Sequence, residues 1–279
     1  MPDVDDSLVA MALTTLGVTD ERPLRPGGQK AVRLVRQGDE LLVMKVIPIA
    51  SSTADALRRA EREVELLGSF KDPHVVQVVS ELAELGDPVV GAAWLEEYLD
   101  GDDLGSHLGP QWPWDEVAVM GLHVSRGLAA GHARSVVHRD LSANNVRRTS
   151  DGTYKVMDFG FARHTLRSGL TFAGQPGTPG FLSPEHLHTY SGAPTAASDV
   201  FCVGILMYAA LTGDLPIPWE GDDATYIRSL MEVRVPSLAA VRPDLTTPQV
   251  RLVERCLHRQ PARRFLNGQR LAEAIEAIS

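Results

Sequence analysis

Cysteine is scarce in this chain, which has only two, Cys202 and Cys256, among its 279 residues. Both stand in apolar surroundings, so the sequence lacks the disulfide framework of a small secreted protein and suits a reducing compartment. The amino-terminal stretch MPDVDDSLVA is acidic where a secretory signal peptide would be basic. We therefore expect a cytoplasmic location.

Long hydrophobic runs and an excess of basic residues are also lacking. The longest apolar run, VFCVGILMYAAL at 200–211, is too short to span a bilayer and is typical of a helix buried at the centre of a domain. A net charge of −9 makes the chain a poor general binder of nucleic acid or anionic membrane. Apolar residues still make up 44% of the sequence, which is enough for a folded core. We expect a globular protein whose partners include neither nucleic acid nor a membrane.

The residue pattern changes near 98–103, which divides the chain into a β-rich part and a mostly helical part. Residues 1–20 form a helical or loosely ordered lead, 21–98 a small lobe and 99–279 a larger lobe, and the two lobes together make one α+β domain. In the small lobe, the patterns predict strands at 30–37, 40–47, 75–82 and 89–98 and one main helix at 51–70. In the larger lobe they predict helices at 115–134, 198–212, 222–233, 248–258 and 267–278.

A β ribbon, NVRRTSDGTYKVMD at 145–158, gives a geometric prediction about three polar residues. Asp151-Gly152 is typical of a two-residue hairpin turn, and with such a turn Asn145 lies opposite Asp158 at the open end of the ribbon. Amide and carboxylate oxygens are hard ligands that suit Mg²⁺ bound to phosphate oxygens. Asp140, in the loop that leads into the same ribbon, is placed to accept a proton from a hydroxyl near that metal.

The order of motifs around these residues resembles the signature of protein kinases. HRDLSANN, DFG and SPE begin at His138, Asp158 and Ser183 and follow one another in the family's order. The resemblance covers roughly 21–275, and the GTPGFLSPE segment is most similar to the eukaryotic-like serine/threonine kinases of bacteria. It implies a bilobal kinase fold and transfer of the ATP γ-phosphoryl group to a protein hydroxyl. The implied cofactors are ATP and Mg²⁺, with Mn²⁺ as an alternative metal.

The resemblance also implies a role for individual residues. Asp140 matches the catalytic aspartate, and Asn145 and Asp158 match the two metal ligands. Lys45 matches the lysine that holds the α- and β-phosphates, and Glu63 matches the helix glutamate that pairs with it. The implied nucleotide-binding residues are Gly27, Gly28, Lys30, Val32, Val43, Lys45, Glu97 and Asp103.

Further residues of the larger lobe match parts of the family's activation machinery. Thr178 matches the threonine that marks serine/threonine specificity, and Asp199 matches the aspartate that anchors the catalytic loop. Arg139 is a potential partner for a phosphorylated activation loop, in which Thr171 is the preferred autophosphorylation site. Autophosphorylation of this kind would bring two copies together as a homodimer. The resemblance also implies a buried ion pair between Glu185 and Arg264.

Several positions depart from the family pattern. RPGGQK at 25–30 keeps only part of the glycine-rich phosphate loop, and Ser142 stands where a lysine usually contacts the transferred phosphate. Glu96 occupies the position before the hinge glutamate, which is normally apolar or threonine. Arg147 replaces the leucine that usually forms the floor under adenine, and Val43 replaces the small alanine of its roof. Glu96 and Arg147 could pair with each other.

Two alternatives to a serine/threonine protein kinase stay open. One is a pseudokinase, a nucleotide-binding scaffold with an altered adenine pocket. The other is a small-molecule kinase of the aminoglycoside or choline type, although such enzymes usually lack a segment ending in GTPGFLSPE. The expected partner is a protein substrate with a serine or threonine hydroxyl. Because no membrane helix or sensor is evident in the sequence, we expect a free-standing kinase.

Overall fold

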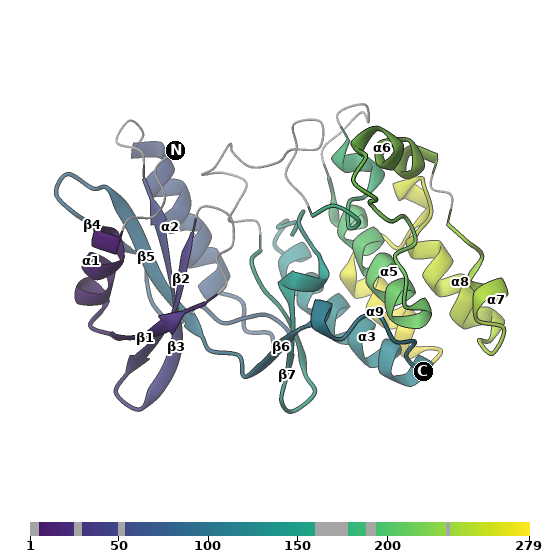
Figure 1. The fold of residues 1–279 in the computed structure, drawn as a ribbon, viewed down its shortest axis with the longest axis horizontal. Coiled ribbons are helices and arrows are strands. Elements are labelled where there is room, and N and C mark those ends of the chain that lie inside the picture. Colours follow the sequence, from purple (N-terminus) through teal and green to yellow (C-terminus); the bar gives the residue numbers. More distant parts are fainter. Residues whose placement is uncertain (1–5, 25–29, 50–53, 160–177, 188–193, 233–234) are drawn as a thin grey trace. The chain divides into compact units, whose positions relative to one another are not determined.

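The structure is a computed structural model that describes residues 6–24, 30–49, 54–159, 178–187, 194–232 and 235–279 (Figure 1). It divides into two compact units. Unit 1 holds the described residues as far as Lys71, together with Val76–Asp100. Unit 2 holds Asp72–Val75 and all the described residues from Gly101 on. Among the described residues, none of the helices combines the length and the apolar character needed to cross a bilayer.

Unit 1 is built on a five-stranded antiparallel sheet with strand order β1-β2-β3-β5-β4. Its strands are β1 (Thr19–Pro23), β2 (Ala31–Gln37), β3 (Glu40–Pro48), β4 (Ala83–Leu85) and β5 (Gly91–Glu97), and its helices are α1 (Asp6–Leu16) and α2 (Ala54–Gly68). β3 and β5 lie at the centre of the sheet and are its most deeply buried strands. Lys45, in the middle of β3, therefore has a paired strand on each side, with Val32 of β2 opposite it on one side and Trp94 of β5 on the other.

Helix α1 packs on the sheet beside β4 and β5 (Figure 1). Its residues Leu8, Val9 and Ala12 join the core formed by the sheet. The helix approaches so closely at Gly91 that a Cβ there would lie 2.7 Å from Leu8. The segment 1–20, expected to be a lead, therefore includes α1 and the start of β1, and both belong to unit 1.

The prediction of a strand at 75–82 is wrong. Only single bridges form there, at Val75 and Val78, and the next strand is the short β4. The hydroxyl oxygen of Ser80 accepts a hydrogen bond from the backbone amide of Leu95 at 2.8 Å. This side-chain oxygen takes the place that a backbone carbonyl would have in a regular strand ladder. A side chain that competes for the partner strand in this way interrupts regular pairing, and the apolar pattern alone does not reveal it.

Unit 2 is mostly helical, as predicted. Its helices are α3 (Trp114–His132), α5 (Ala196–Thr212), α6 (Asp223–Glu232), α7 (Leu238–Val241), α8 (Thr247–Cys256) and α9 (Gly268–Glu276), with short 3₁₀ turns at Leu104–Ser106, Ala143–Asn145, Pro184–His186 and Pro261–Arg263. Helix α5 is buried along almost its whole length and packs against α3, α8 and α9, which confirms the prediction for 200–211. The predicted α+β architecture, a β-rich unit followed by a mostly helical one, is also confirmed.

A three-stranded sheet completes unit 2, with order β6 (Gly101–Asp103), β7 (Val146–Thr149) and β8 (Tyr154–Val156). The predicted two-residue turn between β7 and β8 is wrong by one residue, because Val146 pairs with Val156 and Arg148 with Tyr154. The loop has three residues and ends at Gly152, whose φ of +85° favours glycine. The carboxylate of Asp151 accepts hydrogen bonds from the Thr149 hydroxyl at 2.6 Å and the Thr153 amide at 3.0 Å, and these bonds stabilise the longer turn.

Candidate active site

Lys45 lies in the middle of β3 with its side chain buried. In the register of β3 and β5, Lys45 faces Trp94 and Val43 faces Glu96. Glu96 is thus the diagonal neighbour of Lys45 on the same face of the sheet. The ammonium of Lys45 contacts Glu96 Oε2 at 2.7 Å, and the two side chains are only 7% and 6% exposed. Glu96 Oε1 accepts a hydrogen bond from the indole nitrogen of Trp94 at 2.9 Å.

The other predicted residues of unit 1 are placed only in part. Glu63 lies on α2, but its side chain is outside the described part of the structure, so the expected Lys45–Glu63 pair stays a prediction. Gly27 and Gly28 also lie outside the described residues. Lys30 is buried just before β2, and Val32 and Val43 are half-buried on β2 and β3.

In unit 2, Asp199 fixes the loop that begins at His138. Its Oδ2 accepts hydrogen bonds from the His138 amide at 2.7 Å and from His132 Nε2 at 2.9 Å. Its Oδ1 accepts a hydrogen bond from the backbone amide of Arg139 at 2.9 Å. Arg139 has a φ of +68°, a backbone conformation that is strained for arginine. Burial would raise the pKa of Asp199, but the hydrogen bond and charge of His132 and the other donors outweigh it, and the pKa is lowered. The carboxylate therefore stays charged and holds the loop in its strained conformation.

The same loop carries Asp140, which has a defined environment. Asp140 Oδ1 accepts hydrogen bonds from both the amide and the hydroxyl of Thr178, each at 3.2 Å. The backbone carbonyl of Asp140 accepts the side-chain amide of Asn145 at 2.7 Å. His138 donates from Nε2 to the carbonyl of Met157 at 2.8 Å, and its ring lies 4.9 Å from that of Phe159. These contacts join the 138–145 loop to the chain that leaves β8.

Asn145 and Asp158 offer oxygen atoms of the kind that Mg²⁺ prefers. Met157 donates its amide to the carbonyl of Asn145 at 2.9 Å, so Asn145 pairs with Met157 rather than with Asp158 as predicted. Asp158 follows immediately, and its φ of +57° turns the chain away from the ladder. The side-chain nitrogen of Asn145 donates its hydrogen bond to the backbone carbonyl of Asp140. The side-chain oxygen of Asn145 is therefore the atom that would bind a cation. The residue types thus fit a divalent metal, although the hairpin argument gave the wrong register.

Comparison with known proteins gives the family. A family model described as protein kinase domain matches residues 25–274. The chain belongs to the protein kinase family.

Three bacterial kinases are similar to this kinase domain. It is 30% identical over 270 residues to the serine/threonine-protein kinase pkn3 of Myxococcus xanthus, covering 90% of this chain and 48% of that protein. It is 35% identical over 188 residues to PknL of Mycobacterium tuberculosis, covering 66% of this chain and 46% of that protein. It is 30% identical over 265 residues to PkaA of Streptomyces coelicolor, covering 92% of this chain and 46% of that protein. The kinase domain thus spans about half the length of these relatives.

Two predicted nucleotide-contact residues of the kinase domain have partners within their own units. Asp103 faces Arg147 across the β6–β7 pair, and its Oδ1 contacts the guanidinium of Arg147 at 2.8 Å. Glu97 accepts the amide of Gln77 on its carboxylate at 2.8 Å and donates its own amide to the Gln77 carbonyl at 2.9 Å. Within their own units Glu96 contacts Lys45 and Arg147 contacts Asp103, and the expected pairing of Glu96 with Arg147 stays a prediction.

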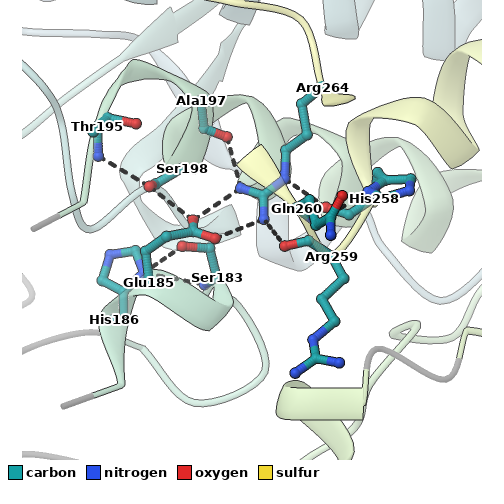
Figure 2. Close-up of polar contacts among 10 residues, drawn as sticks. All are labelled: Ser183, Glu185, His186, Thr195, Ala197, Ser198, His258, Arg259, Gln260 and Arg264. Atoms are coloured by element: carbon teal, nitrogen blue, oxygen red, sulfur yellow. Dashed lines mark hydrogen bonds and ion pairs between the residues drawn. The ribbon is translucent and has the colours of Figure 1, made fainter. Parts of the chain in front are cut away.

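The predicted ion pair between Glu185 and Arg264 is confirmed (Figure 2). Arg264 Nη2 and Nη1 contact the two oxygens of Glu185 at 2.7 and 2.9 Å. The remaining donors of the guanidinium bind three backbone carbonyls, those of Ala197, His258 and Arg259. All five N–H groups of this buried side chain are therefore used, which is the condition under which a buried charge is tolerated.

Sequence reasoning did not predict three supporting residues of the kinase domain. Trp94 binds Glu96, and His132 binds Asp199. Neither Trp94 nor His132 stands in a motif. His186 accepts the amide of Ser183 on Nδ1 and donates from Nε2 to the carbonyl of Arg139 at 2.8 Å. Its position directly after SPE was the one available signal. Asp199, the partner of His132, and Arg139, one partner of His186, are distant from these histidines in the chain, so only the folded structure reveals the two contacts.

Proposed function

We propose that this kinase domain transfers the γ-phosphoryl group of ATP to a serine or threonine hydroxyl of a protein substrate. The observation that carries the proposal is the contact between Asp140 and Thr178. Asp140 lies in a loop whose backbone is held by the buried Asp199, and its carboxylate already accepts a hydrogen bond from a threonine hydroxyl. A substrate hydroxyl would present the same group to the same oxygen.

In the proposed reaction, the substrate oxygen attacks the γ-phosphorus and its proton passes to Asp140. The new oxygen–phosphorus bond forms as the bond to the β–γ bridging oxygen breaks, and ADP leaves. Lys45 would bind the α- and β-phosphates, and Asn145 and Asp158 are the residues that would hold Mg²⁺, or Mn²⁺ in its place. When bound, the metal neutralises phosphate charge. Because little covalent chemistry falls to the protein, positioning of these side chains is its main contribution.

Regulation by autophosphorylation is part of the proposal. Thr171 is the proposed site, Arg139 the proposed partner of its phosphate, and a homodimer the assembly in which one copy modifies the other. Thr171 lies outside the described residues. The position of Thr178 beside Asp140 supports a protein substrate, because this segment matches the family's serine/threonine-specificity motif.

Two ion pairs favour one alternative, a nucleotide-binding scaffold without turnover. Lys45 contacts Glu96 and Asp103 contacts Arg147, and these partners, which the resemblance to active kinases does not imply, support an altered nucleotide pocket. The scaffold predicts that nucleotide raises the melting temperature while no phosphate is transferred.

The deciding experiment measures transfer of labelled phosphate from Mg-ATP to the chain itself and to a mixed serine and threonine peptide library. Asp140→Asn and Lys45→Ala should each lose activity, about 10²–10⁴-fold for loss of the base. Asp39→Asn, an exposed carboxylate in the turn between β2 and β3, is the matched control and should retain activity. Transfer that persists at the wild-type rate in both site variants would overturn the assignment.

A further inference from the structure

Glu96 places a buried carboxylate on β5 of unit 1, at a position where the family usually has an apolar residue or threonine. We propose that Glu96 is a positioning residue for Lys45, and that the sheet itself thereby fixes the ammonium that binds phosphate. This inference rests on the proposed function, because it concerns the same lysine.

The first argument is geometric. Lys45 and Glu96 stand on neighbouring strands joined by a continuous antiparallel ladder that runs from Leu42–Glu97 to Pro48–Gly91. In such a ladder the distance between diagonal neighbours on one face is set by the backbone. The 2.7 Å contact between Lys45 Nζ and Glu96 Oε2 therefore joins two positions that cannot move apart without breaking strand pairing.

The second argument is the arrangement of the carboxylate. Glu96 Oε2 faces the ammonium and Oε1 accepts the Trp94 indole N–H at 2.9 Å. Trp94 is 1% exposed and stands opposite Lys45 in the register, two residues before Glu96 on the same face. Each oxygen thus has a donor, and the tryptophan keeps the carboxylate turned so that its second oxygen meets the lysine.

The third argument is electrostatic. Both side chains are almost fully buried, and a buried charge is tolerated when a partner of opposite charge is in direct contact. Replacing Glu96 by glutamine keeps the shape but removes the charge that compensates the ammonium. The ammonium would then be drawn toward water or toward another acceptor, and its position for binding phosphate would be lost.

The consequence concerns control of the site. The family's lysine is expected to be held by a carboxylate on a helix, here Glu63 on α2, and movement of such a helix can release the lysine. A carboxylate on β5 belongs to the same sheet as Lys45, so its hold on the lysine does not depend on where α2 lies. We therefore expect Lys45 to keep its position when Glu63 is removed, and to lose it when Glu96 is removed.

The test is a double-mutant cycle on nucleotide binding, read with a fluorescent ADP analogue and Mg²⁺, together with kcat and KM for ATP. Glu96→Gln should weaken nucleotide binding about tenfold to a hundredfold, the scale expected for misplacement of a binding group. In the Lys45→Ala background, Glu96→Gln should have no further effect. Glu63→Gln should weaken binding less than Glu96→Gln does, and Trp94→Phe should give an intermediate loss.

Glu84→Gln is the matched control, because Glu84 is an exposed glutamate on β4 of the same sheet, and it should bind nucleotide like wild type. Thermal melting of every variant separates loss of folding from loss of binding. Glu96→Gln binding as tightly as wild type, or losing as much affinity without Lys45 as with it, would overturn the inference. A wild-type chain that binds nucleotide with the predicted coupling but transfers no phosphate would refute the proposed function and leave the role of Glu96 standing.

Discussion

Thr178 donates both its backbone amide and its hydroxyl to one oxygen of Asp140, at 3.2 Å in each case, although the two residues lie 38 positions apart in the chain. The amide of Thr178 makes its bond whatever the side chain is, whereas the hydroxyl bond requires serine or threonine. Segment and loop are supported separately, because Tyr226 accepts the amide of Gly180 at 3.1 Å and Asp199 holds the loop. The hydroxyl contact can therefore be removed while its surroundings remain.

We predict that Thr178→Ala and Thr178→Ser differ sharply in activity. The alanine variant loses the hydroxyl bond, so Asp140 is less well oriented and kcat should fall about tenfold or more. The serine variant keeps the donor and should stay within a few-fold of wild type. Steady-state kinetics with one peptide substrate measure both. Equal losses in the two variants would mean that the threonine methyl, rather than the hydrogen bond, matters.

The pair between Glu185 and Arg264 predicts a large effect on stability. Glu185→Gln leaves a fully buried guanidinium without its counter-charge, which should reduce the free energy of unfolding by about 3–5 kcal/mol. Arg270→Lys alters an exposed ion pair, in which Arg270 contacts Glu273 at 2.8 Å. It should change the free energy of unfolding by less than about 1 kcal/mol. Urea denaturation followed by circular dichroism measures both. A loss at Glu185 no larger than that at Arg270 would contradict the prediction.

The sequence predicted the elements whose signals are local. The helices of unit 2 and the burial of 200–211 follow from apolar periodicity, and their observed bounds differ by only a few residues. The turn at Asp151-Gly152 was predicted one residue too short, because the side chain of Asp151 accepts bonds from Thr149 and Thr153. Such competition depends on the folded geometry rather than on residue spacing.

Partners in the site were harder to predict than its members. Asp140, Asn145 and Asp158 were predicted from the hairpin argument and from the resemblance, and Asp199 from the resemblance alone. The partner of Glu96 could not be found this way, because it depends on the register between β3 and β5, and a shift of one residue would send Glu96 to the other face. The contact of Asp103 with Arg147 likewise follows from the β6–β7 register.

A pair of stacked histidines in unit 2 has a consequence for stability at low pH. The rings of His74 and His123 lie 4.1 Å apart, and Nδ1 of His123 accepts the amide of Tyr154 at 3.3 Å. A protonated ring would lose that acceptor. Burial, then the charges of His74 and Arg126, lower the pKa of His123 from 6.5 to about 4, against a small opposing effect of Asp151.

We predict that the free energy of unfolding falls as the pH is lowered from about 6.5 to about 4. In this window the unfolded chain binds a proton at His123 that the folded chain does not, so acid favours unfolding. The pKa of His74 is also lowered, chiefly by burial and partly offset by Asp72, and its effect has the same sign. His123→Asn keeps an acceptor for Tyr154 but does not titrate. Its stability should therefore depend less on pH, and an unchanged slope would contradict the prediction.

We predict that replacing Arg147 strengthens nucleotide binding rather than weakening it. Its guanidinium contacts Asp103 at 2.8 Å, and the resemblance assigns Asp103 to the nucleotide and the position of Arg147 to the adenine floor. Arg147→Leu would release Asp103 and supply the apolar side chain usual at this position. Because the pair is partly exposed, its loss should alter nucleotide affinity by about 1 kcal/mol, or roughly fivefold, in favour of binding.

The control is Arg148→Leu, on the opposite face of β7, where the affinity should stay unchanged. Titration of the fluorescent ADP analogue against both variants and wild type gives the comparison. Weaker binding by Arg147→Leu would mean that the arginine itself attracts the nucleotide, and that the contact with Asp103 orients the guanidinium for that purpose.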